Sequence, residues 1–302
     1  PRRQAHPGRL PGRRAGRRAA QVTRAMELVD SHCHIDFPQF DEDRDAMIAR
    51  AREAGIAALL AIGIGQGPDQ LAAAIPFAET YEWIYASSGI HPHEAAKATD
   101  THFAQLESLV HHPRVLAIGE IGLDYHYDFS PRDIQAAVFI RQMEIARAAS
   151  LPVIIHCREA WPDCLALLAQ HWRSSGLGGI LHCFSGTLGE AQQGIEMGFQ
   201  ISFAGNVTYP KAQNLRDIAR AIPLESIFIE TDSPYLAPQS RRGKRNEPAF
   251  VAEVARTLAS VRDLPSDEFA AATSANFRRF FRLGQPGRGR TSGSEEEAPS
   301  PC

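Results

Sequence analysis

The chain has 302 residues, of which 44% are hydrophobic, and its formal net charge at pH 7 is −3. This length fits a single α/β barrel of about 250 residues without a second domain. No apolar run approaches the roughly 18 residues that a membrane-spanning helix needs, so we expect no membrane partner.

The cysteines are widely spaced and odd in number, which argues against a disulfide framework. There are five of them, at positions Cys33, Cys157, Cys164, Cys183 and Cys302. Thiols that stay reduced are typical of the cytoplasm, so we expect a cytoplasmic protein.

The charge is distributed unevenly along the chain. Residues 1–25 hold eight arginines and no acidic residue, and the rest has 24 basic and 35 acidic residues, a net charge of −11. We interpret residues 1–25 as a disordered Arg-rich extension upstream of a start at Met26, and the alternative is an arm that binds nucleic acid. Residues 284–302 are rich in Gly, Ser and Pro, which predicts a disordered tail. The folded unit is expected to span residues 26–283.

Short apolar runs recur along this unit at fairly even intervals. In chain order they cover residues 27–30, 57–64, 83–90, 115–123, 152–157, 179–184, 199–205 and 226–231. Stretches with a helical period lie between them, at 43–54, 68–80, 101–112, 132–148, 160–173, 187–197 and 210–220. Apolar runs that alternate with helices are typical of parallel strands buried on both faces. Eight strands favour a single-domain (β/α)8 TIM barrel over a doubly wound sheet, which usually has fewer. Two further helices are expected near 247–260 and 265–281, the second with Ser266 as its N-cap.

Ligand-type side chains gather at one end of the predicted strands, where the active site of such a barrel lies. They are His32, His34, His91, His93, Glu120, Asp124, His156, His182 and Asp232. Buried imidazoles and carboxylates need partners, and a divalent metal supplies them. Four imidazoles and two carboxylates exceed the capacity of one tetrahedral ion, so the pattern predicts two ions that share a carboxylate. Glu120 is our candidate for the bridging residue.

A His-Cys pair occurs three times, at 32–33, 156–157 and 182–183. Successive residues of a strand point to opposite sides, so His32 and His34 share one side and Cys33 faces the surrounding helices. The same alternation predicts that Cys157 and Cys183 are small packing residues behind the histidines.

Seven motifs of the chain carry a family resemblance. In order they are DSHCHIDF (30–37), GIHPH (89–93), GEIGLDY (119–125), HCREA (156–160), HCFSG (182–186), ETDSPYL (230–236) and RRGKRNEP (241–248). Together they resemble the TatD family of metal-dependent deoxyribonucleases, within the amidohydrolase-like barrels. The resemblance implies that one ion is held by His32, His34, Glu120 and Asp232, and a second by Glu120, His156 and His182. The chain departs from a commoner GLDYY pattern at His126, which puts contacts at the edge of the substrate in doubt.

Two ions about 4 Å apart lower the pKa of a shared water and stabilise the attacking and leaving oxygens of a phosphodiester. We hypothesise that Asp232 accepts the proton of this water, with a purely ligating role as the alternative. Asp232 and Glu120 are thus the predicted catalytic residues. The expected cofactors are two divalent ions, Mg²⁺, Mn²⁺ or Zn²⁺, because the imidazoles favour zinc or manganese and the family's nuclease activity is associated with magnesium.

Basic and aromatic residues near the strand ends are the candidates for substrate binding. Arg158 would point to the same side as His156 and pair with a phosphate oxygen, or else with a barrel carboxylate. The basic loop of Arg241, Arg242 and Lys244 would contact nucleic acid, with a solvated charge run as the alternative. The remaining candidates are His91, His93, Tyr125 and Tyr235, with capping or supporting hydrogen bonds as the alternative for the histidines and rim packing as the alternative for the tyrosines. Asp36 and Asp124 are expected to orient ligand imidazoles.

The leading hypothesis is a monomeric 3′-5′ exonuclease that hydrolyses single-stranded DNA from its ends. An acidic body with one short basic loop suits a chain end better than a long duplex. One alternative is a binuclear deacylase that cleaves ester or amide bonds, such as a D-aminoacyl-tRNA deacylase. Another is a catalytically silent metal-binding protein.

Overall fold

A computed structural model describes residues 26–127 and 129–284 of the chain. The segments predicted to be disordered, 1–25 and 284–302, lie outside the described residues apart from Gly284. No helix in the described ranges is long and apolar enough to cross a membrane.

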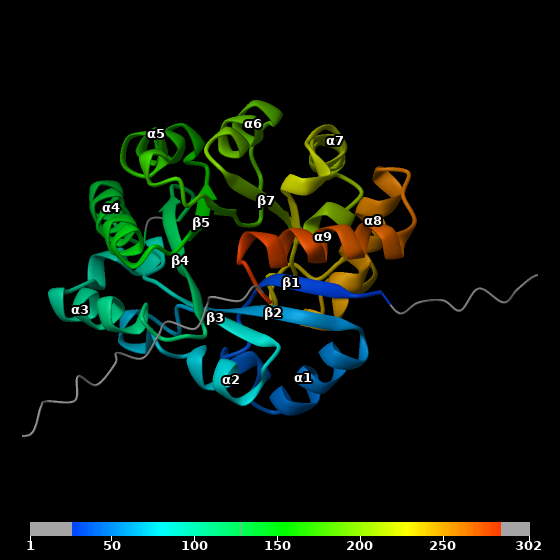
Figure 1. The fold of residues 1–302 in the computed structure, drawn as a ribbon, viewed down its shortest axis with the longest axis horizontal. Coiled ribbons are helices and arrows are strands. Elements are labelled where there is room, and N and C mark those ends of the chain that lie inside the picture. Colours follow the sequence, from blue (N-terminus) through cyan, green and yellow to red (C-terminus); the bar gives the residue numbers. More distant parts are fainter. Residues whose placement is uncertain (1–25, 128, 285–302) are drawn as a thin grey trace, which may run out of the picture.

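The strands form one parallel sheet whose spatial order follows the sequence, and helices surround it (Figure 1). The strands are β1 (Leu28–Cys33), β2 (Ile56–Gly63), β3 (Ile84–Ser88), β4 (Val115–Asp124), β5 (Val153–Arg158), β6 (Gly179–Leu181), β7 (Phe199–Phe203) and β8 (Ile227–Ile229). The helices are α1 (Arg44–Glu53), α2 (Ile75–Thr80), α3 (Asp100–Leu109), α4 (Arg132–Ala149), α5 (Trp161–His171), α6 (Leu188–Glu196), α7 (Gln213–Ala221), α8 (Val251–Val261) and α9 (Ser266–Phe280). The predicted single-domain (β/α)8 barrel is confirmed.

The barrel closes where the ends of β1 and β8 meet. The amide of His34 donates to the carbonyl of Ser233 at 2.8 Å, and the amide of Asp232 donates to the carbonyl of His32 at 2.9 Å. The fully buried Asp30 carboxyl accepts from the Thr231 amide at 2.9 Å and contacts its hydroxyl at 2.6 Å. Burial raises the pKa of Asp30 to about 8, which favours a neutral carboxyl at this seam. Closure therefore brings the histidines at the end of β1 beside the carboxylate that follows β8.

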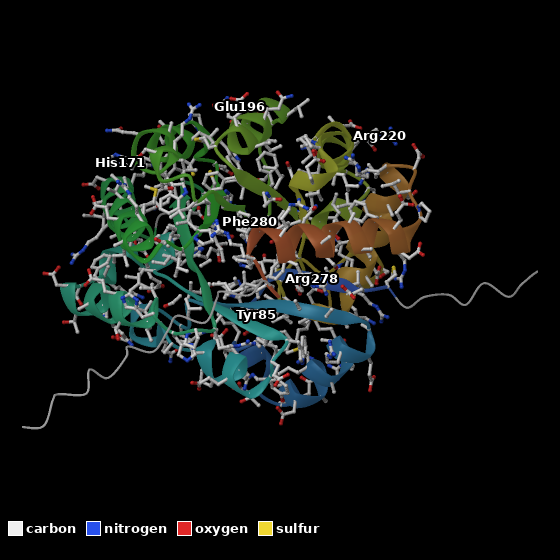
Figure 2. The ribbon with its side chains drawn as sticks, viewed as in Figure 1. Tyr85, His171, Glu196, Arg220, Arg278 and Phe280 are labelled. Atoms are coloured by element: carbon white, nitrogen blue, oxygen red, sulfur yellow. The ribbon has the colours of Figure 1, made fainter. Side chains whose placement is uncertain are left out.

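The last helix covers the mouth formed by the N-terminal ends of the strands. Side chains that point into the barrel pack against Phe277 and Phe281 of α9. Phe280, labelled in Figure 2, lies with its ring centroid 5.7 Å from that of Phe228 in β8. Because this mouth is filled by apolar rings, polar groups can gather only at the opposite mouth, where the strands end.

Two local predictions were wrong. The helix expected over residues 68–80 is a 3-10 turn at Pro68–Gln70 followed by α2, because Pro76 lacks the amide hydrogen a helix interior needs and starts a new helix. The expected N-cap Ser266 is the first residue inside α9, Pro265 occupies the cap position, and no side-chain cap bond forms there.

Candidate metal centre

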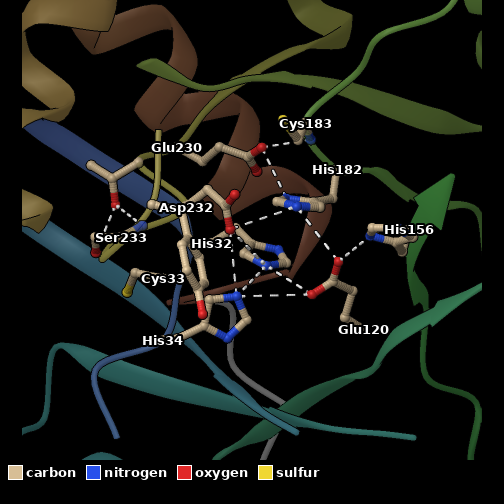
Figure 3. Close-up of polar contacts among 12 residues, drawn as sticks. His32, Cys33, His34, Glu120, His156, His182, Cys183, Glu230, Asp232 and Ser233 are labelled. Atoms are coloured by element: carbon tan, nitrogen blue, oxygen red, sulfur yellow. Dashed lines mark hydrogen bonds and ion pairs between the residues drawn. The ribbon is translucent and has the colours of Figure 1, made fainter. Parts of the chain in front are cut away.

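Strand ends bring together the six residues predicted to bind metal (Figure 3). His32 lies in β1 and His34 just after it, Glu120 lies in β4, His156 in β5, His182 directly follows β6, and Asp232 follows β8. His32, His34, Glu120 and His182 are at most 5% exposed. The polar cluster is thus closed on the barrel side and open only towards the mouth.

A bulge in β4 directs Glu120 into the barrel. Ile118 pairs with Val153 and Ile121 with Ile155, so β4 has one residue more than β5 between these pairs. Such bulges re-aim a side chain locally. A Cβ on Gly119 would meet the side chain of Ile154 at 2.5 Å, so the bulge requires glycine at this position.

The two oxygens of Glu120 face different imidazoles. Oε2 lies 3.3 Å from Nε2 of His32 and 3.9 Å from Nε2 of His34. Oε1 lies 2.8 Å from Nδ1 of His156 and 3.6 Å from Nε2 of His182. A carboxylate that divides its oxygens in this way can bridge two cations.

Asp232 completes the half of the cluster near β1. Its Oδ1 lies 3.4 Å from Nε2 of His34 and 3.8 Å from Nε2 of both His32 and His182. The Nε2 atoms of His32 and His34 are themselves only 3.3 Å apart. Imidazole nitrogens that converge on each other and on two carboxylates form a donor set suited to a cation.

The electrostatics of the cluster fit a divalent cation. Burial opposes charge on His182, yet the carboxylates of Glu230, Glu120 and Asp232 outweigh it and raise the pKa of His182 to about 10. Burial likewise opposes charge on Glu120, but the surrounding imidazoles hold its pKa well below the usual range. The carboxylates therefore need positive charge beside them, and a metal ion would supply it while leaving the imidazoles neutral as ligands.

Candidate donor atoms fall into overlapping groups of three, each within 4.8 Å of one another. One group is His32, His34 and Glu120, another is His32, His182 and Asp232, and a third is Glu120, His156 and His182. The third group matches the second ion site implied by the family resemblance. Two further groups overlap these: His91, His93 and His156 are all partly buried, whereas in the group of His182, Cys183 and Glu230 only the cysteine is partly exposed.

Two carboxylates lie against the imidazoles of the third group, His156 and His182. Asp124 Oδ2 lies 2.9 Å from Nε2 of His156, as expected for an orienting residue. Glu230 Oε1 lies 3.0 Å from Nδ1 of His182, an ion pair whose angle falls short of a hydrogen bond. Glu230 is a functional candidate that sequence reasoning missed. The signal available in the sequence was the residue type, because Glu230 is a carboxylate that directly follows the apolar residues of β8.

The expected role of the cysteines is correct for two of the three His-Cys pairs. Cys33 and Cys157 are buried among the helix-facing core residues. Cys183 is partly exposed, because β6 ends at Leu181 and residue 183 adopts a φ of +43° outside any strand. Its amide donates to Glu230 at 2.6 Å, so the backbone at this position serves the site and strand alternation does not apply.

Three of the residues predicted to contact substrate, His91, Arg158 and Tyr125, differ in their surroundings and exposure. His91 Nε2 is 3.6 Å from Glu120 Oε1, and burial lowers the pKa of His91 to about 4. Arg158 is exposed, with its guanidinium 4.8 Å from the centre of the Tyr127 ring. Tyr125 donates its hydroxyl to Asp163 at 2.7 Å, and the guanidinium of Arg132 lies 4.0 Å from its ring centre. One face of Tyr125 is therefore already occupied.

The other residues predicted to bind substrate or to orient ligands are His93, Tyr235 and Asp36. His93 contacts Asp124 Oδ2 at 2.7 Å, and Tyr235 lies at the rim, 49% exposed, edge-on to His34. Asp36 Oδ1 is buried without a hydrogen-bond partner in the described part of the chain, so its orienting role stays a prediction.

The basic loop is exposed and anchored at one end. Arg241 and Arg242 lie over the rings of Phe250 and Tyr209, and Lys244 is exposed. Arg245 pairs with both oxygens of Asp43 at 2.6 and 2.8 Å, just before α1. Three cations of the loop thus remain accessible, and the fourth ties the loop to the barrel.

The ion pair between Arg245 and Asp43 predicts a pH-dependent contribution to the free energy of unfolding. The Arg245 and Arg50 guanidiniums hold the pKa of Asp43 well below its usual range. Because the folded-state pKa is depressed, the stabilisation is present above the unfolded pKa of about 3.9 and is lost as pH falls below it. Solvent screens these side chains, so Asp43→Asn should lower the free energy of unfolding at pH 7 by about 0.5–1 kcal/mol.

Urea unfolding of wild type and Asp43→Asn at pH 7 and pH 3 measures this effect. The difference between the two proteins should shrink at pH 3. An equal difference at both pH values would show that the charge of Asp43 contributes nothing.

The fold and the donor cluster agree with the comparisons to known proteins. The family model described as TatD related DNase matches residues 29–282. The chain belongs to the TatD family of DNases. It is 38% identical over 256 residues to an uncharacterised metal-dependent hydrolase, YabD, of Bacillus subtilis, covering 85% of this chain and 99% of that protein.

Two further relatives are informative. A protein of Cronobacter turicensis named 3′-5′ ssDNA/RNA exonuclease TatD is 38% identical over 259 residues, which cover 84% of this chain and 97% of that protein. The crystal structure of YjjV, a TatD homologue of Escherichia coli K12, aligns with a TM-score of 0.80 at 32% identity and covers 86% of this chain and all of that one. As a TatD family member, the protein is a metal-dependent hydrolase of nuclease type.

Proposed function

We propose that the protein is a binuclear metal-dependent phosphodiesterase that removes nucleotides from the 3′ end of single-stranded DNA. The observation that carries this proposal is the division of Glu120 between two imidazole pairs, with Oε2 near His32 and His34 and Oε1 near His156 and His182. The relative from Cronobacter turicensis, named as an exonuclease on single-stranded DNA and RNA, supports the same class of substrate.

The donor groups and the family resemblance support the following assignment of residues to each ion. His32, His34, Glu120 and Asp232 would hold the first, and Glu120, His156 and His182 the second. Bound divalent cations would lower the pKa of a water and stabilise negative charge on a phosphate. The protein's own part is to place these charges in a pocket from which bulk water is largely excluded, where they act more strongly than in solvent.

Asp232 is the candidate general base. Its side chain is 15% exposed, more than that of Glu120 at 4%, so it can reach a water at the mouth. Nearby imidazoles outweigh burial and lower the pKa of Asp232, which keeps its carboxylate ionised and able to accept a proton. Arg158, exposed at the end of β5, is positioned to bind a phosphate oxygen and orient the diester.

Metal reconstitution with labelled oligonucleotides tests this proposal. Metal-stripped protein should be inactive, and Mg²⁺, Mn²⁺ or Zn²⁺ should restore release of single nucleotides from the 3′ end of a single strand. A 5′-labelled substrate would then give a descending ladder, while a matched duplex would be cut more slowly. Activity on small esters without cleavage of any oligonucleotide would favour a deacylase instead.

The basic loop provides a second test. Replacing Arg241, Arg242 and Lys244 with glutamine should raise KM for oligonucleotides and leave kcat nearly unchanged. If all three contact phosphates, the slope of log affinity against log salt should fall by about 2. A slope equal to that of wild type would show that the loop is a solvated charge run.

A charge-matched control uses cations at the opposite end of the barrel. Arg147, Arg173 and Arg220 lie at or just beyond the C-terminal ends of α4, α5 and α7, and Arg220 is labelled in Figure 2. Their replacement with glutamine should leave the salt slope unchanged, because these side chains are remote from the strand ends.

A further inference from the structure

Two exposed aromatic rings stand beside the metal centre without an assigned role. In residues 26–127 and 129–284, the large apolar side chains that are exposed are Tyr127, Phe129, Ile134, Leu188 and Tyr235. Phe129 is 63% and Tyr127 40% exposed, and their rings stack with centroids 5.2 Å apart and planes 9° from parallel. We call Tyr127 and Phe129 the aromatic pair. Phe129 is the more exposed ring of the pair, and such exposure is unfavourable for an apolar ring unless something covers it.

One carboxylate links the aromatic pair to the metal centre. Asp124 Oδ1 accepts the amides of His126 and Tyr127, each at 2.9 Å, and so forms the turn after β4. Asp124 Oδ2 contacts His156 at 2.9 Å and His93 at 2.7 Å. The ring of His93 lies 4.9 Å from that of Phe129 and 5.9 Å from that of His156. The aromatic pair is therefore separated from a candidate ligand by a single imidazole.

Buried polar residues hold both ends of the segment that carries the pair. The Gln135 side chain accepts the Asp124 amide at 2.8 Å and donates to the carbonyls of Asp124 and Ser130 at 3.0 and 2.8 Å. The hydroxyl of Ser130 donates to the carbonyl of His93 at 2.9 Å. Gln135 and Ser130 are 1% and 2% exposed. Rings presented from fixed ends lose little conformational entropy when a ligand covers them.

A cation accompanies the rings. The guanidinium of Arg158 lies 4.8 Å from the centre of the Tyr127 ring. His126, which precedes Tyr127 in the sequence, pairs with Glu159 at 2.7 Å. Aromatic faces beside an arginine are the combination by which proteins bind single-stranded nucleic acid, with bases on the rings and phosphates at the cation.

We propose that the aromatic pair is a base-stacking platform for the nucleotide next to the scissile phosphodiester. This rests on the proposed function and specifies how the substrate strand is held. A base inside a duplex has both faces covered by its neighbours, so it must leave the stack before it can pack on Phe129. The platform therefore favours single strands, and it tolerates any sequence because every base has a π-face.

Binding measurements with abasic substrates test the platform. The probe is a fluorescent phosphorothioate octamer of deoxythymidine, bound to metal-loaded protein, with one position made abasic at a time. One position should weaken binding to wild type about 5- to 100-fold, the range of a base–aromatic stack. Phe129→Ala should weaken binding of the intact octamer by a similar factor and remove the penalty at that position.

Two conservative variants separate stacking from apolar contact. Phe129→Leu retains apolar area without an aromatic face and should behave as Phe129→Ala, whereas Phe129→Trp should restore wild-type binding. Wild-type affinity in Phe129→Leu would overturn the platform. An abasic penalty that persists in Phe129→Ala would overturn it as well, since base and ring would then act independently.

The outcomes also distinguish the platform from the proposed function. If base and Phe129 are coupled but no oligonucleotide is cleaved with any metal, the platform stands and the phosphodiesterase proposal fails. If single strands are cleaved normally by Phe129→Ala with an unchanged KM and no coupling appears, the platform fails and the phosphodiesterase proposal stands.

Discussion

Asp232→Asn is expected to lower kcat for oligonucleotide hydrolysis about 10²- to 10⁴-fold, the range for removal of a general acid or base. Asparagine keeps the size of the side chain and one oxygen, but it cannot accept a proton. The backbone of Asp232 has a φ of +56°, and asparagine tolerates this left-handed conformation better than most residues. The substitution therefore removes the base with little cost to the local fold.

Steady-state kinetics and metal analysis on the same samples separate the two roles of Asp232. Loss of turnover with both ions retained supports the general base. If turnover is lost and one of the two ions is lost as well, the result supports a ligand role alone. Normal turnover with both ions bound would show that Asp232 is not the base. Asp217→Asn, an exposed change in α7, serves as the control and should match wild type.

Glu230→Gln is expected to weaken binding of the second ion about 10- to 100-fold, the usual effect of losing a carboxylate that holds a ligating histidine. Glu230 is fully buried and contacts His182, the amide of Cys183 and the hydroxyl of Ser202. Glutamine can still accept one of these hydrogen bonds, but it places no charged oxygen beside Nδ1 of His182. The imidazole should then lose the orientation that points Nε2 towards Glu120.

Metal titration by calorimetry measures this effect. Affinity at the proposed site formed with His32 and His34 should change little, and affinity at the proposed second site should fall. Asp124→Asn is the matched comparison, because Asp124 holds His156 as Glu230 holds His182. Two sites of wild-type affinity in Glu230→Gln would show that the carboxylate is structural only.

The arrangement of the strands and most of the site could be predicted because their signals are local. Alternation within a strand placed His32 and His34 on one side and Cys33 on the other, and the structure agrees. The apolar runs predicted every strand to within a few residues. For the same reason the prediction was wrong at Cys183, where the strand ends early and alternation no longer holds.

The residues that sequence reasoning missed depend on contacts between distant segments. The role of Glu230 depends on the approach of β8 to the segment after β6. Only this approach lets the Glu230 carboxylate reach His182. Tyr127 and Phe129 resemble ordinary loop residues until Asp124 is seen to hold both their turn and His156. Likewise, the sequence shows Arg245 only as one of several cations in a basic run. The structure shows that it differs from the others because it pairs with Asp43.

The barrel, its strand order and the types of side chain at the strand ends follow from the sequence, because periodicity and composition act over a few neighbouring residues. Contacts between distant segments set which nitrogen faces which oxygen, how Glu120 divides between two imidazole pairs, and which rings remain exposed. These features depend on closure of the barrel between β1 and β8 and on the bulge in β4, which bring residues up to about two hundred positions apart into contact.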